Sequence, residues 1–252
     1  MPTPTYTALC TAKKTLARDI VEFRLQKPAG FTFKAGQFVL FSLPLIENPA
    51  DIQTRAFSIA SAPYEDDLLF VAKLLKGGRA SRFIEERLEP GVAVSMQGPF
   101  GLFTLRQSFV SAQDDKGAHD DIARRDILMV ATSTGVAPFR GQILEAIHAG
   151  FTGNIDLLFT VRSEADIFWK EELESIAARH PNVKLHISLT DGSDEWTDHR
   201  GRVQTVLPQI AKDLTQRQLY VCGNPAMVKE LRTLALTEWG MAKEDVHGEG
   251  YI

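Results

Sequence analysis

Two short segments of the sequence combine glycine and hydroxyl residues in a way that suits phosphate binding. The longer one, Ala131–Arg140, reads ATSTGVAPFR and lies between an apolar run and an amphipathic one. Pro138 suits the first turn of a helix, and Gly135 lets the backbone amides at that helix start come close to an anion. The segment predicts a pyrophosphate cradle of the kind found in nucleotide-binding sheets, with an ordinary strand-to-helix turn as the alternative.

The second segment, Gly77–Ser81, reads GGRAS and again places glycines and a hydroxyl at a predicted helix start. Such a start favours an anionic ligand, because the first backbone amides of a helix have no partner within it. Two phosphate cradles in different parts of the chain predict two bound nucleotides.

A guanidinium, an aromatic ring and a hydroxyl follow one another in Arg55-Ala56-Phe57-Ser58. Strand alternation puts Arg55 and Phe57 on one side and Ser58 on the other, unless a twist or bulge turns all three toward one ligand. Taken alone the segment is weak, because an arginine on a strand is more often part of a surface ion pair. Its meaning depends on the elements that position it.

The first half of the chain has the pattern of a small all-β domain. Short runs rich in Val, Ile, Phe and Thr alternate with turn signals such as Pro90-Gly91. The predicted strands are Thr7–Lys13, Ile20–Gln26, Gln37–Leu43, Arg55–Ala60, Leu68–Leu75 and Val92–Gln97, with one helix at Ala80–Leu88. Six strands at this spacing predict an antiparallel β-barrel.

The second half alternates strand, turn and helix. The predicted pairs are Ile127–Ala131 with Pro138–Ala149, Ile155–Val161 with Ile167–Arg179, Val183–Thr190 with Arg202–Ala211, and Gln218–Val221 with Ala226–Trp239, before a last strand near Val246–Tyr251. This rhythm predicts a doubly wound α/β domain, with a parallel sheet covered by helices on both faces. The acidic segment between the halves reads as a loop or linker, so the predicted domains are 1–106 and 125–252, joined by 107–124.

The composition narrows the classes of function. The 252 residues carry 28 Lys and Arg against 32 Asp and Glu, a net charge of −4 that does not suit nucleic-acid binding. No apolar run approaches the roughly 20 residues of a membrane-spanning helix, and the first residues do not resemble a targeting signal. We therefore expect a cytoplasmic protein without a membrane span. Two cysteines are too few for a four-cysteine zinc site or an iron–sulfur cluster, so any such cluster must lie on a partner chain.

Taken together and in this order, the motifs resemble the ferredoxin–NADP reductase superfamily, in which a flavin-binding barrel precedes a nicotinamide-nucleotide domain. Two further motifs support the resemblance, Gly-Pro-x-Gly at 98–101 and Cys-Gly-x-Pro-x-Met at 222–227. It spans about residues 6–251. It implies hydride transfer from NADH or NADPH to bound FAD, with FMN a poorer fit, and electron delivery to ferredoxin, flavodoxin or an oxygenase component.

The resemblance also implies roles for residues in the barrel half. Arg55 would contact the flavin phosphates, Phe57 the isoalloxazine ring, and Ser58 would lie near flavin N5, with Ala56 between them in the motif. The phosphates would also be held by the backbone of Gly78, Arg79, Ala80 and Ser81. Phe57 stands where the family usually has Tyr, so a ring contact is retained but a phenolic hydrogen bond is lost.

In the second half, the resemblance implies contacts between the nicotinamide dinucleotide and a set of loop residues. These are Thr134, Gly135, Val136, Pro138, Thr190, Cys222 and Gly223. Ser133 stands where many relatives have Gly, which puts the closeness of this loop to the pyrophosphate in question. NADP-specific relatives have Ser-Arg where this chain has Thr190-Asp191, so we predict a preference for NADH.

The two cysteines receive different predictions. Cys222 follows an apolar strand and precedes a Gly-Asn-Pro turn, so its thiol should emerge at the carboxyl edge of the sheet. The resemblance places it beside the nicotinamide C4, whereas the alternative is a small buried hydrophobic residue. Cys10 has no such context and is predicted to be structural.

The ending Gly248-Glu249-Gly250-Tyr251-Ile252 is similar to the acidic and aromatic ending of plant-type members, with one extra residue. By that analogy Glu249 would close a polar network with Ser58 and Cys222, and Tyr251 would lie against the flavin. The alternative is a tyrosine that only covers an apolar edge. Ser58, Cys222, Glu249 and Tyr251 are therefore the predicted catalytic residues.

The sequence also bears on other classes of function. A hydrolase is disfavoured because the sequence has neither a Gly-x-Ser-x-Gly elbow nor a His-Glu-x-x-His zinc motif. Two alternatives stay open, a flavin reductase that releases reduced flavin and an electron-transfer subunit that is active only with a partner chain. We expect a monomer, and we expect the six histidines to be surface or capping residues.

Overall fold

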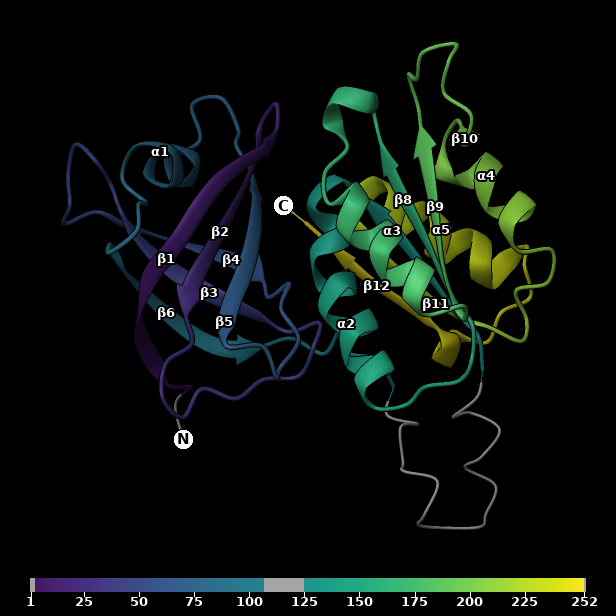
Figure 1. Ribbon diagram of the computed structural model, residues 1–252, viewed down its shortest axis with the longest axis horizontal. Helices are drawn as coiled ribbons and strands as arrows, with labels where there is room; N and C mark the ends of the chain where they lie inside the picture. The colour runs from purple at the N-terminus through teal and green to yellow at the C-terminus, as the bar shows by residue number, and fades with distance from the viewer. Residues whose placement is uncertain (1–2, 107–124, 252) are drawn as a thin grey trace. The chain divides into compact units, whose positions relative to one another are not determined.

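A computed structural model of the chain describes residues 3–106 and 125–251 (Figure 1). The chain divides into two compact units, Met1–Leu105 with Ala137–Gln142, and Arg106–Val136 with Ile143–Ile252. The predicted acidic linker at 107–124 lies outside the described residues. No helix in the described ranges is long and apolar enough to cross a membrane.

The first unit is built on a six-stranded antiparallel sheet with the order β4-β3-β6-β1-β2-β5. Its strands are β1 (Thr5–Ala17), β2 (Ile20–Gln26), β3 (Phe38–Pro44), β4 (Ile52–Ser58), β5 (Asp67–Lys73) and β6 (Ala93–Phe100). Just past β4, the Ala60 amide donates to the Leu69 carbonyl of β5 at 2.8 Å, which brings the two edges of the sheet together. Helix α1 (Arg79–Glu86) lies between β5 and β6 in the chain.

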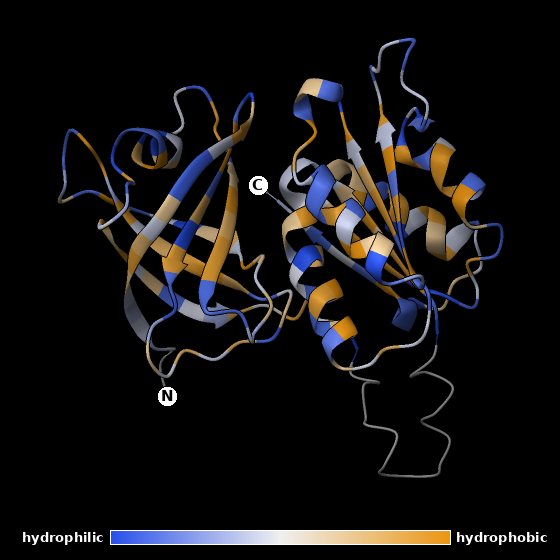
Figure 2. Cartoon of the chain, in the orientation of Figure 1, coloured by the Kyte–Doolittle hydropathy of each residue, from blue (hydrophilic) through white to orange (hydrophobic). Residues whose placement is uncertain are grey.

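Aromatic side chains fill the barrel core. Phe23 stacks on Phe70 with ring centroids 5.3 Å apart, and Phe41 meets Phe70 edge-on at 5.0 Å. Figure 2 shows hydrophobic residues recurring along these strands, the pattern expected when alternate side chains face a core. Cys10 is buried in the same cluster, the structural position predicted for it.

The second unit contains a six-stranded parallel sheet with the order β10-β9-β8-β7-β11-β12. The strands are β7 (Ile127–Thr132), β8 (Ile155–Val161), β9 (Val183–Leu189), β10 (His199–Arg200), β11 (Gln218–Gly223) and β12 (Val246–Gly250). The order reverses between β7 and β11, and the crevice at such a switch point is where doubly wound sheets bind nucleotides. The predicted antiparallel barrel and parallel α/β sheet are confirmed.

Helices cover both faces of the parallel sheet. Residues of α4 (Val203–Ile210) and α5 (Pro225–Thr237) form one core cluster with alternate residues of β7 and β11 and with Leu158 of β8. Figure 1 shows α2 (Ala137–His148) and α3 (Lys170–Arg179) on the other face. Three short 3-10 turns, η1 (Ser133–Val136), η2 (Glu164–Asp166) and η3 (Lys243–Asp245), complete the described elements.

Many element boundaries differ from the predictions by one to four residues; β1, for example, runs from Thr5 to Ala17 rather than from Thr7 to Lys13. The reason is clear for three differences. β4 ends at Ser58 rather than Ala60, because the chain leaves β3 there and pairs with β5 instead. The helix predicted from Ile167 begins at Lys170, because Trp169 has a left-handed φ of 56° that a helix cannot include. The two-residue strand β10 was not predicted, since two residues carry no periodicity.

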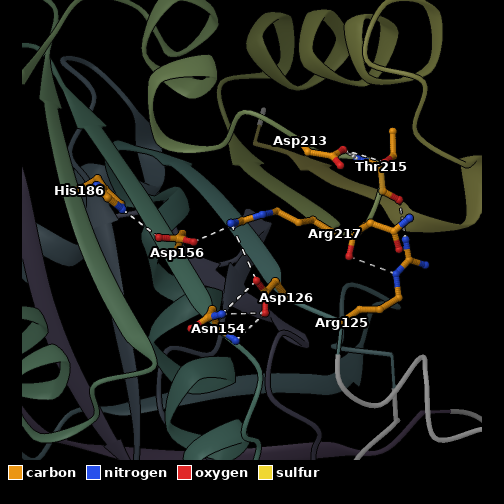
Figure 3. A network of polar contacts seen from close by, with 9 residues as sticks. Arg125, Asp126, Asn154, Asp156, His186, Asp213, Thr215 and Arg217 are labelled. Carbon is orange, nitrogen blue, oxygen red and sulfur yellow. Dashed lines mark hydrogen bonds and ion pairs between the residues drawn. The ribbon is translucent and has the colours of Figure 1, made fainter.

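Polar side chains join the amino ends of the parallel strands (Figure 3). Arg217 donates to the Asp156 carboxylate at 2.6 Å, and the His186 ring nitrogen lies 3.0 Å from the other Asp156 oxygen. Asp126 in turn accepts from the Asn154 amide at 2.8 Å. Burial raises the pKa of the Asp156 carboxyl, but the hydrogen bonds from His186 and Arg217 outweigh it and hold that pKa below its usual value.

The prediction that all the histidines are surface or capping residues is wrong for several of them. His186 and His199 are half-buried, with ring nitrogens 3.3 Å apart. His247 stacks on the buried Tyr220 ring at 4.4 Å. These residues pack against polar or aromatic neighbours from other elements, which their scattered sequence positions do not show. His119 lies outside the described residues.

Candidate functional site

The start of α1 forms the first predicted phosphate cradle. Gly77 has a φ of +73° that favours glycine, and Gly78 is the N-cap residue in an extended conformation. A Cβ on Gly78 would lie 2.9 Å from the Ser81 hydroxyl and 3.0 Å from the Leu75 carbonyl. The Ser81 hydroxyl accepts from the Leu75 amide at 2.8 Å, so it holds the loop against the helix. The backbone approach at this turn therefore requires glycine.

The charges of α1 fit an anionic ligand at its start. Its first turn contains no acidic residue, and Arg79 and Arg82 place cations at the positive end of the helix dipole. Carboxylates from the β3–β4 hairpin balance them, with Asp51 2.8 Å from Arg79 and Glu47 paired with Arg82. Cations at a helix N-terminus are unfavourable by themselves but favourable beside a diphosphate, so this turn fits the phosphates of a flavin dinucleotide.

Strand β4 carries the second flavin motif at its carboxyl end. Arg55 is exposed and its guanidinium donates to the neighbouring Thr54 carbonyl at 2.9 Å. Phe57 is half-buried, with its ring centroid 5.0 Å from that of Phe41. In the register, Arg55 lies opposite Phe41 and Ser58 opposite Phe38, so Arg55 and Phe57 share one face and Ala56 and Ser58 the other. Part of the Phe57 ring therefore packs against the barrel core.

The Gly-Pro-x-Gly motif packs close to the same end of the sheet. Gly101 has a φ of +98°, and a Cβ there would lie 3.0 Å from the Phe38 ring. The Gly101 carbonyl accepts from the Gln37 side-chain amide at 3.2 Å. The motif therefore brings a loop onto the strand that pairs with Ser58.

The second cradle lies at the switch point of the parallel sheet. A Cβ on Gly135 would lie 2.3 Å from the Cys222 carbonyl oxygen, and a Cβ on Gly223 would lie 2.3 Å from the Thr132 hydroxyl. The Thr132 hydroxyl also accepts from the Asn224 amide at 2.9 Å. The loops after β7 and β11 thus touch backbone to backbone, and only glycine allows this approach.

The remaining predicted residues of this loop divide by exposure. Pro138 lies in the first turn of α2, as predicted, and it is buried together with Val136. Thr134 is half-buried. Ser133 has a φ of 50°, a left-handed conformation that glycine would adopt without strain.

Cys222, Glu249 and Tyr251 come together at the carboxyl end of β11. Cys222 and Glu249 are register partners on β11 and β12, and the Tyr251 amide donates to the Gly223 carbonyl at 2.8 Å. A hydrogen bond links the Tyr251 side chain to the Cys222 thiol. Cys222 is fully buried, and burial together with the Glu249 carboxylate raises the pKa of its thiol well above the usual range. Both effects favour the protonated thiol at neutral pH.

The loop after β9 contains Thr190 and Asp191. The Thr190 amide donates to Val161 of β8 at 3.2 Å, and the Asp191 carboxylate lies 3.5 Å from the exposed Arg162 guanidinium. Arg200 donates to the carbonyls of Gly192, Ser193 and Trp196, so its cation is used to hold this loop. Arg162, directly after the end of β8, therefore faces the Asp191 carboxylate.

Thr132 and Asn224, which join the loops after β7 and β11, were not among the predicted site residues. The Asn224 side chain accepts from the amides of Ala226 and Met227 and caps α5. The sequence does carry a signal for Asn224, because Asn followed by Pro is typical of an N-cap and the first helical position. Nothing in the sequence indicates that the Thr132 hydroxyl meets the turn after β11.

Known proteins similar to this chain show the family to which it belongs. Residues 8–105 match the oxidoreductase FAD-binding domain, and residues 129–233 match the oxidoreductase NAD-binding domain. The ferredoxin--NADP reductase B of Sorangium cellulosum is 32% identical over 255 residues, which cover 98% of this chain and 97% of the relative. The chain belongs to the ferredoxin–NADP reductase superfamily. It is an oxidoreductase with an FAD-binding and an NAD-binding domain, and FAD and NAD(P)H are its cofactors.

Other relatives and solved structures agree. The ferredoxin--NAD(P)(+) reductase component of the Pseudomonas putida naphthalene 1,2-dioxygenase system is 26% identical, over 95% of this chain and 67% of its own length. The Amycolatopsis cytochrome P450 reductase GcoB superposes with a TM-score of 0.84 at 24% identity, over 98% of this chain and 70% of that one. A Neisseria gonorrhoeae ferredoxin NADP⁺ reductase with bound FAD and NADP gives 0.78 at 20%, over 98% of both chains. The solved structures support the fold.

In this superfamily the flavin supplies the redox chemistry, accepting a hydride and passing electrons on. The protein must bind the two nucleotides, orient them and exclude water. The two glycine-dependent cradles fit the binding task. Cys222, Glu249 and Tyr251 fit an orienting task, because they bring polar groups together at the carboxyl end of β11.

Proposed function

We propose that this chain oxidises NADH by hydride transfer to FAD held in its barrel domain, and delivers the electrons to a separate protein. The observation that carries the proposal is the pair of turns that require glycine, one at Gly78 in the FAD-binding region and one at Gly135 in the NAD-binding region. A single nucleotide site would need only one of them.

The proposal assigns each cluster a task. The amides of Gly78 to Ser81 and the Arg55 guanidinium hold the flavin phosphates, and Phe57 and Ser58 contact its ring system. Thr134, Thr190 and Gly223 bind the nicotinamide nucleotide. Cys222, Glu249 and Tyr251 orient the nicotinamide, which the hydrogen bond between Cys222 and Tyr251 supports. The domain limits proposed for these tasks are 1–106 and 125–252.

The acceptor is proposed to be a ferredoxin, a flavodoxin or an oxygenase component. The relatives support this class, since they are named as a ferredoxin reductase, a naphthalene dioxygenase reductase and a phenol 2-monooxygenase reductase component. A monomeric state and a cytoplasmic location are part of the same proposal.

Purified protein tests the proposal directly. The chain should carry about one flavin and reduce ferricyanide with NADH in the absence of a partner, which a subunit inert on its own would not do. It should then reduce purified ferredoxins or flavodoxins faster than it reduces free flavin. Turnover that depends on added free flavin, with reduced flavin released, would instead establish the flavin reductase.

A preference for NADH is proposed from the loop after β9. An NADPH 2′-phosphate at this position would meet the Asp191 carboxylate, and the nearby Arg162 is already paired with that carboxylate. The comparison that decides is kcat/KM for NADH against NADPH. A value about tenfold higher for NADPH, the difference made by roughly 1.4 kcal/mol, would contradict the assignment.

A further inference from the structure

The helix that holds the flavin phosphates in the proposed function is fastened at its far end by a lysine from another part of the barrel. Lys13 of β1 donates to the carbonyls of Ile84 and Glu85, each at 3.0 Å, and to the Glu89 carboxylate at 2.7 Å. Its side chain is only 15% exposed. These are three acceptors on one ammonium, and the carbonyls belong to the last turn of α1.

Helix α1 needs such a fastening because it is short. It has eight residues, whereas isolated helices below roughly 12 to 15 residues are marginal in water. Its last turn contains no basic residue, so the favourable cation at its negative end comes from Lys13, 71 positions away from Ile84. Phe83 and Ile84 bury one face of the helix, and Ser81, Arg79 and Arg82 hold its amino end, so Lys13 supplies the polar contact at its carboxyl end.

We propose that Lys13 is a positioning residue for FAD. By capping the carboxyl end of α1, it fixes where the amino end presents its amides to the flavin phosphates. The proposal rests on the phosphate site proposed at Gly78–Ser81. It concerns binding of the phosphate-bearing part of the flavin and leaves the ring contacts at β4 unaffected.

The test compares flavins with and without phosphate. Lys13→Met keeps the aliphatic stem and removes the ammonium, and Lys14→Met is a matched control because the neighbouring ammonium pairs with Glu22 at 3.2 Å. The full-length proteins, freed of flavin, are titrated with FAD, FMN and riboflavin by flavin fluorescence. Lys13→Met should raise the Kd for FAD and FMN about tenfold, within the usual range of coupling between two sites. Riboflavin should bind as it does to wild type, and Lys14→Met should change none of the three.

An equal loss of affinity for all three flavins would overturn the proposal, because Lys13 would then only stabilise the barrel. Unchanged FAD affinity would overturn it as well. Hydrogen exchange of the flavin-free protein gives a second readout, since Lys13→Met should speed exchange of the amides in 79–86, and unchanged protection there would refute the anchoring. If wild-type protein binds riboflavin as tightly as FAD, the phosphate site itself is wrong, whatever the Lys13 variant does.

Discussion

At the scale of single residues, Ser133 combines backbone strain with a functional position. Its φ of 50° lies at the start of the loop proposed to hold the dinucleotide. Ser133→Gly should stabilise the protein by about 0.5–1 kcal/mol, the left-handed penalty less the extra chain entropy of glycine. Thr134→Gly is the control, because Thr134 has no positive φ and should only lose stability. Thermal unfolding measures both, and a lower melting temperature for Ser133→Gly would contradict the strain argument.

Cys222 and Glu249 are predicted to act on the rate of hydride transfer. If they orient the nicotinamide, replacing either by Ala loses alignment in the transition state, and the loss appears in kcat more than in nucleotide affinity. Stopped-flow reduction of the flavin by NADH measures this step. Cys10→Ala, a change at the other buried cysteine, should leave the rate unchanged. Equal rates in the Cys222 and Cys10 variants would return Cys222 to a packing role.

Asp191 is predicted to set the coenzyme preference through Arg162. Asp191→Ala removes the repulsive carboxylate and frees the guanidinium, so kcat/KM for NADPH should rise about fivefold, as expected for roughly 1 kcal/mol from an exposed charge pair. NADH kinetics should change little. Asp194→Ala removes an exposed carboxylate from the same loop and should leave the ratio unchanged. If the ratio of kcat/KM for NADPH to that for NADH rose equally in both variants, the effect would come only from the change in net charge.

The sequence predicts best those residues whose structural role depends only on their neighbours in the chain. Gly78, Gly135 and Pro138 were found because helix starts and tight turns depend on neighbouring residues. The contacts of Lys13 with α1 and of Thr132 with the turn after β11 were not found, because each joins segments more than 70 positions apart. Whether Ser58, Cys222 and Glu249 form one network stays a prediction.

At the scale of elements, periodicity located the strands well and their ends less well. β2 and β8 have the predicted bounds, because each is a run rich in strand-forming residues with turn residues on both sides. β4 was placed three residues late at its start, since Ile52 to Thr54 are mostly exposed on an edge strand and lack the alternation of a buried one. Hydrogen-bonding partners decide such ends, and those partners are distant in sequence.

The network at the amino ends of the parallel strands predicts a stability effect that depends on pH. The pKa of Asp156 is lowered in the folded state, so its stabilising contribution is present above the unfolded pKa of about 3.9 and is lost as the pH falls through the folded value. Asp156→Asn removes the nearer carboxylate from Arg217, leaving only Asp126 at 3.9 Å, and should cost about 3 kcal/mol at neutral pH.

The loss of stability in Asp156→Asn should shrink toward zero in acid, because wild type loses the same interaction there. Urea unfolding at neutral pH and near pH 3 measures the difference. Asp194→Asn, a change of an exposed carboxylate, should cost little at either pH. A cost for Asp156→Asn that is the same at both pH values would show that the carboxylate's charge is not the source.

At the scale of the whole molecule, the chain has separate domains for FAD and for the nicotinamide nucleotide. Hydride transfer requires the two nucleotides to meet. The barrel unit supplies the α1 cradle, and the parallel-sheet unit supplies the Gly135 cradle beside Cys222 and Tyr251. We predict that the protein controls turnover at the step in which the two nucleotides meet.

Tyr251 is the residue predicted to control that step. Its backbone is held by the Gly223 carbonyl and its side chain by the Cys222 thiol, so it occupies the neighbourhood assigned to the nicotinamide. We predict that its ring covers the flavin and must leave before hydride can move. Stacked aromatic pairs contribute roughly 0.5–1.5 kcal/mol beyond burial, and expelling the ring opposes nucleotide binding by about that amount.

Tyr251→Ser should therefore tighten the binding of NAD⁺, and it should slow turnover because the oxidised nucleotide leaves late. Tyr251→Phe separates the two contacts of the side chain, since it keeps the ring and removes the hydroxyl that meets Cys222. If the ring is the gate, the Phe variant keeps wild-type affinity and only the Ser variant gains. Titration with NAD⁺ and NADP⁺, followed by flavin absorbance, measures these affinities. Wild-type affinities in Tyr251→Ser would mean that the tyrosine only covers the end of β11.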